Sequence, residues 1–253
     1  MKIVLVGYGR MGKEIHTIAT QKGHEIICRV DPIAGVGDTT KLTLDIAKSA
    51  DAIIEFALPQ NMDYNIDIYA QSKTPVVIGT TGWQEKQNQY QEKIISAGAT
   101  LLYGSNYSIG AHLLFRLCGY AAKMVNSISD YDLMISEIHH KFKKDSPSGT
   151  ALTLANYVMK NCKRKTHLVT QQLTDRAIKE NELHLLALRG GSIAGTHTLI
   201  LDSDVDTIEI THQARSRSGF ALGAVLASSW LVNKPSGFYK IEDFMNEFIG
   251  EIA

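Results

Sequence analysis

Short apolar runs alternate with longer amphipathic segments over the first hundred residues of the chain. The apolar runs are rich in Val and Ile and predict β-strands at residues 3–6, 25–30, 52–56, 76–78 and 100–103. Helical spacing between them predicts helices at residues 11–21, 60–71 and 84–96, whereas early glycines favour a loop at 34–47. Because the strands are apolar throughout and alternate with helices, we expect an α/β domain with a doubly wound parallel sheet.

The pattern changes after residue 107. A helix is predicted at residues 111–125, a strand at 131–138 and a second helix near Ser148. Three further strands, joined by short connections, are expected at residues 183–188, 196–201 and 207–212. Neighbouring strands of this kind favour a mixed or antiparallel sheet, so residues 108–218 are predicted to form a smaller α+β domain. A final helical pattern covers residues 219–232 and could pack on either domain.

Composition narrows the possible functions. The 253 residues are 44% hydrophobic, enough for one large core or two modest ones. Lys and Arg together number 26, as do Asp and Glu, so no basic excess suggests a nucleic-acid partner. Three distant cysteines argue against a disulfide framework, and the longest nearly apolar run, residues 220–232, is too short to span a bilayer. With no signal peptide before the first strand, we expect a cytoplasmic protein without a membrane segment.

A glycine-rich turn supplies the first chemical signal. It reads Gly7-Tyr8-Gly9-Arg10-Met11-Gly12, between a predicted strand and a predicted helix. This is the context of a Rossmann phosphate turn, in which the three glycines permit a tight turn, close approach of the pyrophosphate and close helix packing. The helix N-terminus would supply N–H groups and partial positive charge. A glycine turn without a ligand is the alternative.

Asp31 ends the second predicted strand, about twenty residues after the turn, where an acid commonly accepts hydrogen bonds from the adenosine ribose. Its charge favours NADH over NADPH, unless Arg10 or Arg29 offsets repulsion of the 2′-phosphate. Since Pro32 rather than a basic residue follows it, we expect NADH or the use of both cofactors.

Residues 137–151 contain two histidines, three lysines and a Pro-Ser-Gly-Thr helix start. Ser148 is a predicted N-cap, and Gly149 and Thr150 in the first turn could form an anion site, although simple capping is the alternative. Strand alternation places His139 and His140 on opposite faces, and Lys141 and Lys143 on the face of His139 while the extended pattern lasts. Mutual repulsion of these cations should lower their pKa values and suit them to acid–base chemistry. No HExxH or cysteine pair accompanies them, so no metal is predicted.

The same segment resembles the signature of the 4-hydroxy-tetrahydrodipicolinate reductase (dihydrodipicolinate reductase) family, approximately E-x-H-H-x-x-K-x-D-x-P-S-G-T-A. Further family-like motifs follow in order along the chain. They are Gly-x-Gly-Arg-Met-Gly at 7–12, Gly-Thr-Thr-Gly at 79–82, Ser-Asn-Tyr-Ser-Ile-Gly at 105–110, Arg-Gly-Gly-Ser-Ile-Ala-Gly-Thr-His at 189–197, His-Gln-Ala-Arg-Ser-Arg at 212–217 and Phe-Ala-Leu-Gly-Ala at 220–224.

The resemblance implies reduction of a cyclic dicarboxylate by NADH or NADPH, in the diaminopimelate route to lysine. It assigns His139 as proton donor or acceptor and Lys143 as a second proton donor, with His140, Gly149 and Thr150 binding a substrate carboxylate. The cofactor's nicotinamide side would be lined by Gly79, Thr80, Thr81, Gly104, Ser105, Asn106 and Tyr107.

The resemblance also implies domain roles. Residues 1–107 would bind the dinucleotide, with residues 219–253 packing back on them. Residues 108–218 would bind substrate and build a homotetramer through their sheets.

Two departures from the family pattern stand out: Ala57 lacks the usual hydroxyl, and Gly104-Ser105 replaces Ala-Pro. Two other functions are compatible with parts of the sequence. A different two-domain oxidoreductase acting on an amino acid or sugar would share residues 1–107, and a nucleotide-binding sensor would keep the fold without turnover.

Overall fold

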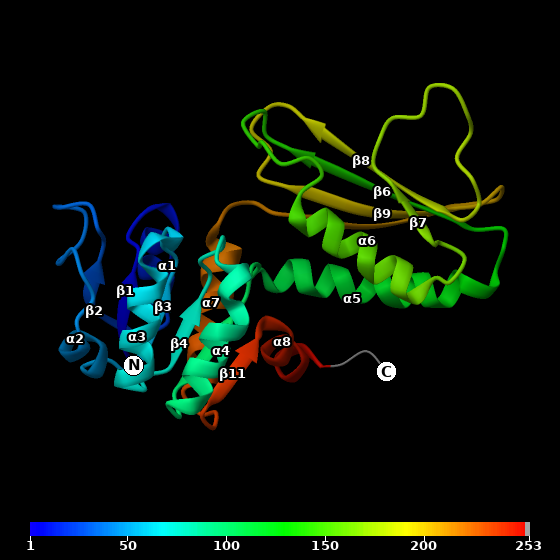
Figure 1. Cartoon of the computed structure of the whole chain (residues 1–253). Helices are drawn as coiled ribbons and strands as arrows, with labels where there is room; N and C mark the ends of the chain where they lie inside the picture. Colours follow the sequence, from blue (N-terminus) through cyan, green and yellow to red (C-terminus); the bar gives the residue numbers. More distant parts are fainter. Residues whose placement is uncertain (251–253) are drawn as a thin grey trace. The chain divides into compact units, whose positions relative to one another are not determined.

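The computed structural model describes residues 1–250, which form two compact units (Figure 1). One unit comprises Met1–Ser108 together with the C-terminal segment that begins at Arg217, and the other comprises Ile109–Ser216. The second unit is therefore inserted between two parts of the first.

The first unit contains a parallel six-stranded sheet with the order β11-β5-β4-β3-β1-β2. Its strands are β1 (Lys2–Val6), β2 (Glu25–Val30), β3 (Ala52–Glu55), β4 (Val76–Ile78), β5 (Thr100–Tyr103) and β11 (Gly237–Lys240). Its helices are α1 (Arg10–Gln21), α2 (Leu44–Lys48), α3 (Met62–Ser72), α4 (Gln87–Ser96), α7 (Ser218–Leu231) and α8 (Ile241–Ile249), with 3₁₀ turns at Pro59–Asn61 and Gln84–Lys86. The predicted doubly wound parallel sheet is confirmed.

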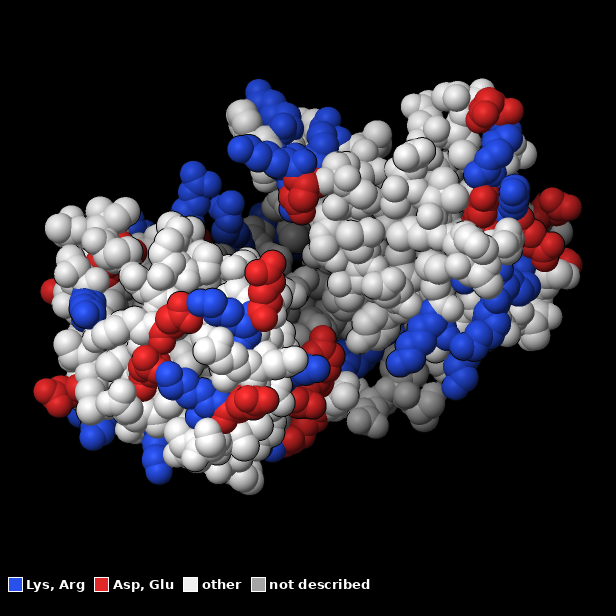
Figure 2. Space-filling model, viewed as in Figure 1, with Lys and Arg blue, Asp and Glu red and all other residues white. Residues whose placement is uncertain are grey.

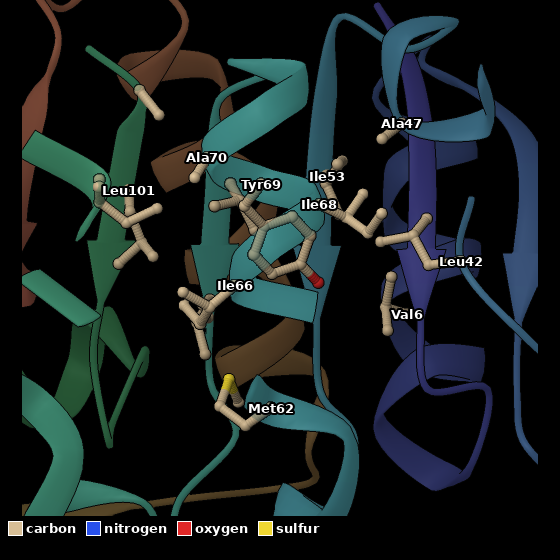
Figure 3. Packing of buried hydrophobic residues seen from close by; sticks show 14 of the residues in the cluster. Val6, Leu42, Ala47, Ile53, Met62, Ile66, Ile68, Tyr69, Ala70 and Leu101 are labelled. Carbon is tan, nitrogen blue, oxygen red and sulfur yellow. The ribbon is translucent and has the colours of Figure 1, made fainter. Parts of the chain in front are cut away.

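Helices cover both faces of this sheet. On one face α3 and α4 pack on alternate strand residues, and Figure 3 shows Met62, Ile66 and Tyr69 of α3 in one cluster with residues of the strands, such as Ile53 and Leu101. On the other face α7 crosses β3, β4 and β5 and packs along α1. Because side chains on successive strand residues point to opposite faces, an apolar residue is needed at nearly every strand position.

The second unit contains a mixed five-stranded sheet with the order β10-β9-β6-β8-β7. Its strands are β6 (Asp132–His139), β7 (His167–Val169), β8 (Glu182–Arg189), β9 (Thr196–Asp202) and β10 (Thr207–Gln213). Strand β6 runs parallel to β8 and antiparallel to β9, so the predicted mixed sheet is confirmed. Helices α5 (Ile109–Met124) and α6 (Gly149–Asn161) pack on one face, and a 3₁₀ turn at Val125–Ser127 follows α5.

The alternation of buried and partly buried side chains along β6 places two residues of the candidate site. Leu133 and Ile135 are buried beneath α5 and α6, and Glu137 and His139 continue the same buried face to the end of the strand. Two polar residues thus occupy positions that the pleat directs toward the helices, at the point where α6 begins.

The extended pattern ends at His139, so the alternation that would place Lys141 and Lys143 on the face of His139 does not reach these lysines. Strand β6 ends at His139, and the Lys143 N–H donates to the His140 carbonyl in a turn (3.1 Å). Strands β7 and β11 and helix α8 were not predicted, and the expected loop at 34–47 contains the start of α2. Within residues 1–250, no helix is long and apolar enough to cross a membrane.

Candidate active site

The glycine-rich turn connects β1 to α1. Gly7 has φ +89°, and a Cβ there would lie 2.3 Å from the Phe56 carbonyl oxygen. A Cβ at Gly12 would lie 2.2 Å from the Gly7 carbonyl oxygen, whereas one at Gly9 would meet no atom within 4 Å. No side chain caps the N-terminus of α1 and no acid lies in its first turn. Open space at Gly9 before uncapped amides fits the pyrophosphate of a dinucleotide.

A cavity of about 740 Å³ adjoins this turn within the first unit. Gly7, Pro32 and Ala57, which follow β1, β2 and β3, contribute to its lining. Lys41 and Tyr64 line it from neighbouring segments. Ligands of parallel α/β sheets bind at this carboxyl edge, so the cavity is suited to the adenosine half of the cofactor.

Asp31 lies beside the cavity but is only 7% exposed. Its carboxylate accepts hydrogen bonds from the backbone N–H groups of Tyr8 (2.8 Å) and Ile33 (3.0 Å). Arg29 forms an ion pair with Asp38 and lies over the Tyr8 ring. Asp31 therefore holds the glycine-rich turn to the loop after β2, and its contact with the ribose stays a prediction.

The predicted nicotinamide-side residues lie in the loops after β4 and β5. Thr80 accepts a hydrogen bond from the Ala57 N–H through its hydroxyl (2.9 Å), which ties the loop after β4 to the loop after β3. Thr81 and Ser105 are exposed, and the Asn106 side chain accepts from the Ser108 N–H (2.9 Å). A Cβ at Gly79 would collide with the Phe56 ring, and one at Gly104 would approach Ile241 to 2.8 Å.

Tyr107 occupies a different position from that expected of a cofactor-lining side chain. Its ring is 1% exposed, packs on Phe56 and donates its hydroxyl hydrogen to the Ile78 carbonyl (2.9 Å). The Tyr107 side chain is therefore not placed to touch a ligand at this edge.

Glu137 is the centre of a buried polar cluster in the second unit. Its carboxylate accepts hydrogen bonds from Arg189 (2.7 Å), from His197 Nε2 (3.1 Å) and from the N–H and hydroxyl of Ser148 (N–H at 2.9 Å). His139 Nδ1 lies 3.5 Å from the same carboxylate. The cluster joins β6, β8, β9 and the start of α6, so it fixes these four elements at one end of the sheet.

The cluster contains a carboxylate that stays charged, Glu137, and a histidine that stays neutral, His139. Burial alone would raise the pKa of Glu137, but hydrogen bonds from His197, Ser148 and Arg189 hold it well below its usual range. Burial lowers the pKa of His139 to about 4, and the charges of Lys143 and Arg189 act in the same direction while Glu137 opposes them. His139 is therefore neutral near pH 7.

The other nitrogen of His139 lies against Gly195. A Cβ at position 195 would approach His139 Nε2 to 2.7 Å, so only a glycine leaves this edge of the ring uncovered. Nδ1 faces Glu137 and Nε2 faces the glycine, which leaves Nε2 as the nitrogen suited to exchanging a proton with a ligand.

His140 and Lys143 lie in the turn that follows β6. His140 donates its N–H to the Ile193 carbonyl (2.8 Å), and its Nδ1 accepts from the Phe142 N–H (3.2 Å). Lys143 is partly exposed and pairs with the exposed Asp145 (2.9 Å). Figure 2 shows Lys and Arg side chains gathered at this end of the second sheet, around a small acidic patch. An exposed pair of this kind is weak, so Lys143 can exchange Asp145 for another anion.

Helix α6 begins beside these cations. Ser148 is its N-cap and accepts from the Ala151 N–H through its hydroxyl (3.1 Å). A Cβ at the exposed Gly149 would meet no atom within 4 Å, and no acid lies in the first turn. The carboxylate site predicted at Gly149 and half-buried Thr150 stays a prediction.

Glu137, His139 and His197 are metal-ligating residue types whose ligand atoms lie within 4.8 Å of one another. However, the Glu137 carboxylate already carries the Arg189 guanidinium at 2.7 Å, and a cation beside that guanidinium would be repelled. We interpret the three residues as part of a hydrogen-bonded cluster.

Two family models cover most of the chain. The model described as dihydrodipicolinate reductase, N-terminus, matches residues 1–107, and the one described as dihydrodipicolinate reductase, C-terminus, matches residues 110–245. The chain belongs to the dihydrodipicolinate reductase family. The resemblance found in the sequence is thus confirmed.

Individual members of the dihydrodipicolinate reductase family are similar over nearly the whole chain. The 4-hydroxy-tetrahydrodipicolinate reductase of Christiangramia forsetii is 37% identical, covering 98% of each protein. That of Aquifex aeolicus is 36% identical, covering 97% of this chain and 98% of the relative. The structure of dipicolinate-bound dihydrodipicolinate reductase from Paenisporosarcina sp. TG-14 superimposes with a TM-score of 0.74 at 20% identity, covering 95% of this chain and 97% of that one. This last similarity supports the fold.

In the sequence, Glu137, Arg189 and His197 appear only as letters of family motifs, without an assigned role. The structure brings them together although 52 and 60 residues separate Glu137 from its two partners. The indication in the sequence was that polar residues occur near glycine-rich ends of strands. No spacing rule connects segments so far apart in the chain.

Proposed function

We propose that the chain catalyses the NAD(P)H-dependent reduction of 4-hydroxy-tetrahydrodipicolinate to tetrahydrodipicolinate. The observation that carries the proposal is the end of β6, where neutral His139, cationic Lys143 and the first turn of α6, which contains no acid, surround the Glu137 cluster. These groups supply what a small dicarboxylate requires: anion binding and a source of protons.

The net reaction consumes one hydride and one proton and releases water. When bound, the nicotinamide cofactor supplies the hydride. The amides of Gly149 and Thr150 and the imidazole of His140 bind a substrate carboxylate, with the positive end of α6 adding to the attraction. Lys143 stabilises negative charge that develops on the ring and donates the proton that quenches it.

Glu137 and Gly195 prepare His139 for its part in proton transfer. The carboxylate lies on the Nδ1 side and favours a proton there, which leaves Nε2 as the acceptor. Gly195 keeps that nitrogen uncovered. Glu137 acts as a positioning residue, since it also holds Ser148 and thereby the start of α6.

Lys143→Ala tests the assignment. We expect the turnover rate to fall by ~10²-fold or more, because both charge stabilisation and a proton donor are lost. Loss of nicotinamide absorbance measures turnover, and calorimetric titration measures nucleotide affinity, which should stay nearly unchanged. Lys144→Ala is the matched control and should retain near-normal turnover, as its side chain is an exposed neighbour without a proposed role.

The alternatives have distinct outcomes in the same assay. Turnover on amino acids or sugars, with none on the dicarboxylate, would identify a different oxidoreductase. Nucleotide binding without turnover on any member of a substrate panel would indicate a sensor. Near-normal turnover of Lys143→Ala would contradict the role given to this lysine.

We also infer a cytoplasmic homotetramer formed through the second sheet. The sheet face opposite α5 and α6 carries the exposed side chains of Leu186 and Leu188, with Ile138 in register beside Leu188. Exposed leucines in adjacent rows favour an interface. Light scattering coupled to gel filtration measures the mass, and a monomer at micromolar concentration would contradict the inference.

A further inference from the structure

We propose that Lys41 binds the adenosine 2′-phosphate of NADPH, so that the chain binds NADPH at least as tightly as NADH. The inference rests on the proposed use of a nicotinamide dinucleotide and concerns which of the two is recognised. It assigns a specificity-determining role to a residue that lies ten positions after Asp31 and outside the glycine-rich turn.

The lining of the cavity carries a positive charge. Lys41 is the one residue with a formal charge among those that line the 740 Å³ cavity in the described part of the chain. Its neighbours in the lining include Pro32 and Val30 at the end of β2, where the ribose of a dinucleotide binds in folds of this kind. The cavity is therefore positive where a 2′-phosphate would lie.

Asp31 is placed so that its carboxylate repels a 2′-phosphate only weakly. Its carboxylate was expected to repel a 2′-phosphate, but both oxygens accept backbone N–H groups, from Tyr8 and Ile33. The residue is almost entirely buried and does not contribute to the lining of the cavity. Amide dipoles aimed at a carboxylate offset part of its field, so Asp31 repels a nearby anion less than a free carboxylate would.

The backbone around Lys41 is held on both sides. The Thr39 carbonyl accepts from the Asp31 N–H (3.0 Å), which joins this segment to the end of β2. The Leu42 carbonyl accepts from the Tyr64 hydroxyl (2.8 Å). The Lys41 ammonium lies 4.1 Å from the centre of the Tyr64 ring, so the side chain is oriented as well.

Lys41 also keeps its charge available. Within residues 1–250, no carboxylate oxygen lies within ion-pair distance of its ammonium, in contrast to Arg29, which Asp38 neutralises. The side chain is exposed and long enough to move from the tyrosine ring to an arriving phosphate. An oriented, unpaired ammonium at the rim of a cavity is the arrangement that a phosphate dianion binds.

Dissociation constants of NADPH and NADH, measured by isothermal titration calorimetry on the full chain, test the proposal. In Lys41→Gln the dissociation constant of NADPH should rise about 10- to 100-fold, and that of NADH about twofold or less. Lys41→Arg should restore most of the NADPH affinity, because it keeps the charge. Lys22→Gln, an exposed lysine at the other end of α1, is the matched control and should bind both nucleotides normally.

The fragments 2′,5′-ADP and 5′-AMP repeat the comparison without the nicotinamide. Equal losses for the two members of a pair, or no loss for either, would overturn the role of Lys41. Failure of the unaltered protein to bind either dinucleotide would instead contradict the proposed function. A thermal melt of each variant confirms that it is folded.

Discussion

Glu55 and Glu137 are both completely buried, yet their surroundings push their pKa values in opposite directions. Glu55 ends β3 in the first unit and accepts hydrogen bonds from the Tyr69 hydroxyl and the Asn65 amide, which are neutral donors. Burial raises the pKa of Glu55 to about 7, and these hydrogen bonds only moderate the rise. In the second unit, Arg189, His197 and Ser148 together lower the pKa of Glu137.

The comparison shows that burial does not decide the charge of a carboxylate; the charge and number of its donors do. Glu137 is a permanent anion that holds the candidate catalytic groups. Glu55 changes its charge near neutral pH, because burial raises its pKa to about 7. It lies behind the predicted cofactor edge, since Thr80, which hydrogen-bonds to it, leads into that edge.

Removing the charge of each carboxylate gives the largest expected contrast. Glu137→Gln leaves the Arg189 guanidinium without its anion, so the free energy of unfolding should fall by about 3–5 kcal/mol. Glu55→Gln keeps the neutral state that burial favours and should change it by less than about 1 kcal/mol at pH 5, where Glu55 is protonated in the folded protein. Urea titration followed by circular dichroism measures both variants, and similar losses would show that the donors do not distinguish the two sites.

The pH dependence of stability sharpens the comparison. The folded-state pKa of Glu55, about 7, lies above its ordinary value of 4.5, so its contribution to stability is complete below pH 4.5 and is lost as the pH rises through 7. The loss should approach about 3 kcal/mol by about pH 8. Subtracting the profile of Glu55→Gln from that of the unaltered protein isolates this contribution, since groups common to both cancel. A flat difference between pH 5 and 8 would be inconsistent with the raised pKa.

The smallest expected effect compares two helix caps. Ser148 caps α6 and also donates its hydroxyl hydrogen to Glu137, whereas Thr43 caps the short helix α2 on the surface through a 3.3 Å hydrogen bond. Ser148→Ala should lower the free energy of unfolding by about 2 kcal/mol, and Thr43→Ala by about 0.5 kcal/mol. Urea titration measures both, and equal losses would mean that the link to Glu137 adds nothing.

Most of the first unit could be predicted because its information is local. The runs that form β2, β4 and β5 are rich in apolar residues and bounded by turn residues, and their predicted limits match the structure. Strand β11 lacks such a signal, since its four residues begin with a glycine, follow a proline and a serine, and become a strand only by pairing with β5. Strand β7 has three residues and likewise depends on its partner, β8.

The candidate site likewise has parts that could be predicted from local sequence and parts that depend on distant segments. His139, Lys143 and the start of α6 are close in sequence and could be grouped from it. The turn after β6 could not be predicted, because it depends on the hydrogen bond from His140 to Ile193, far along the chain. The field that lowers the pKa of His139 likewise depends on tertiary burial and on Arg189. Lys41 was missed because its closeness to the end of β2 comes from the Thr39 bridge.

The late position of β11 has a consequence for synthesis of the protein. A chain that leaves the ribosome from its N-terminus exposes all of Ile109–Ser216 before α7 and β11 have been made. The inserted unit can therefore acquire its full fold first. Until α7 and β11 are made, the sheet of the first unit has an unpaired edge at β5 and an uncovered apolar face. In this protein the part that is translated first is the last to be completed.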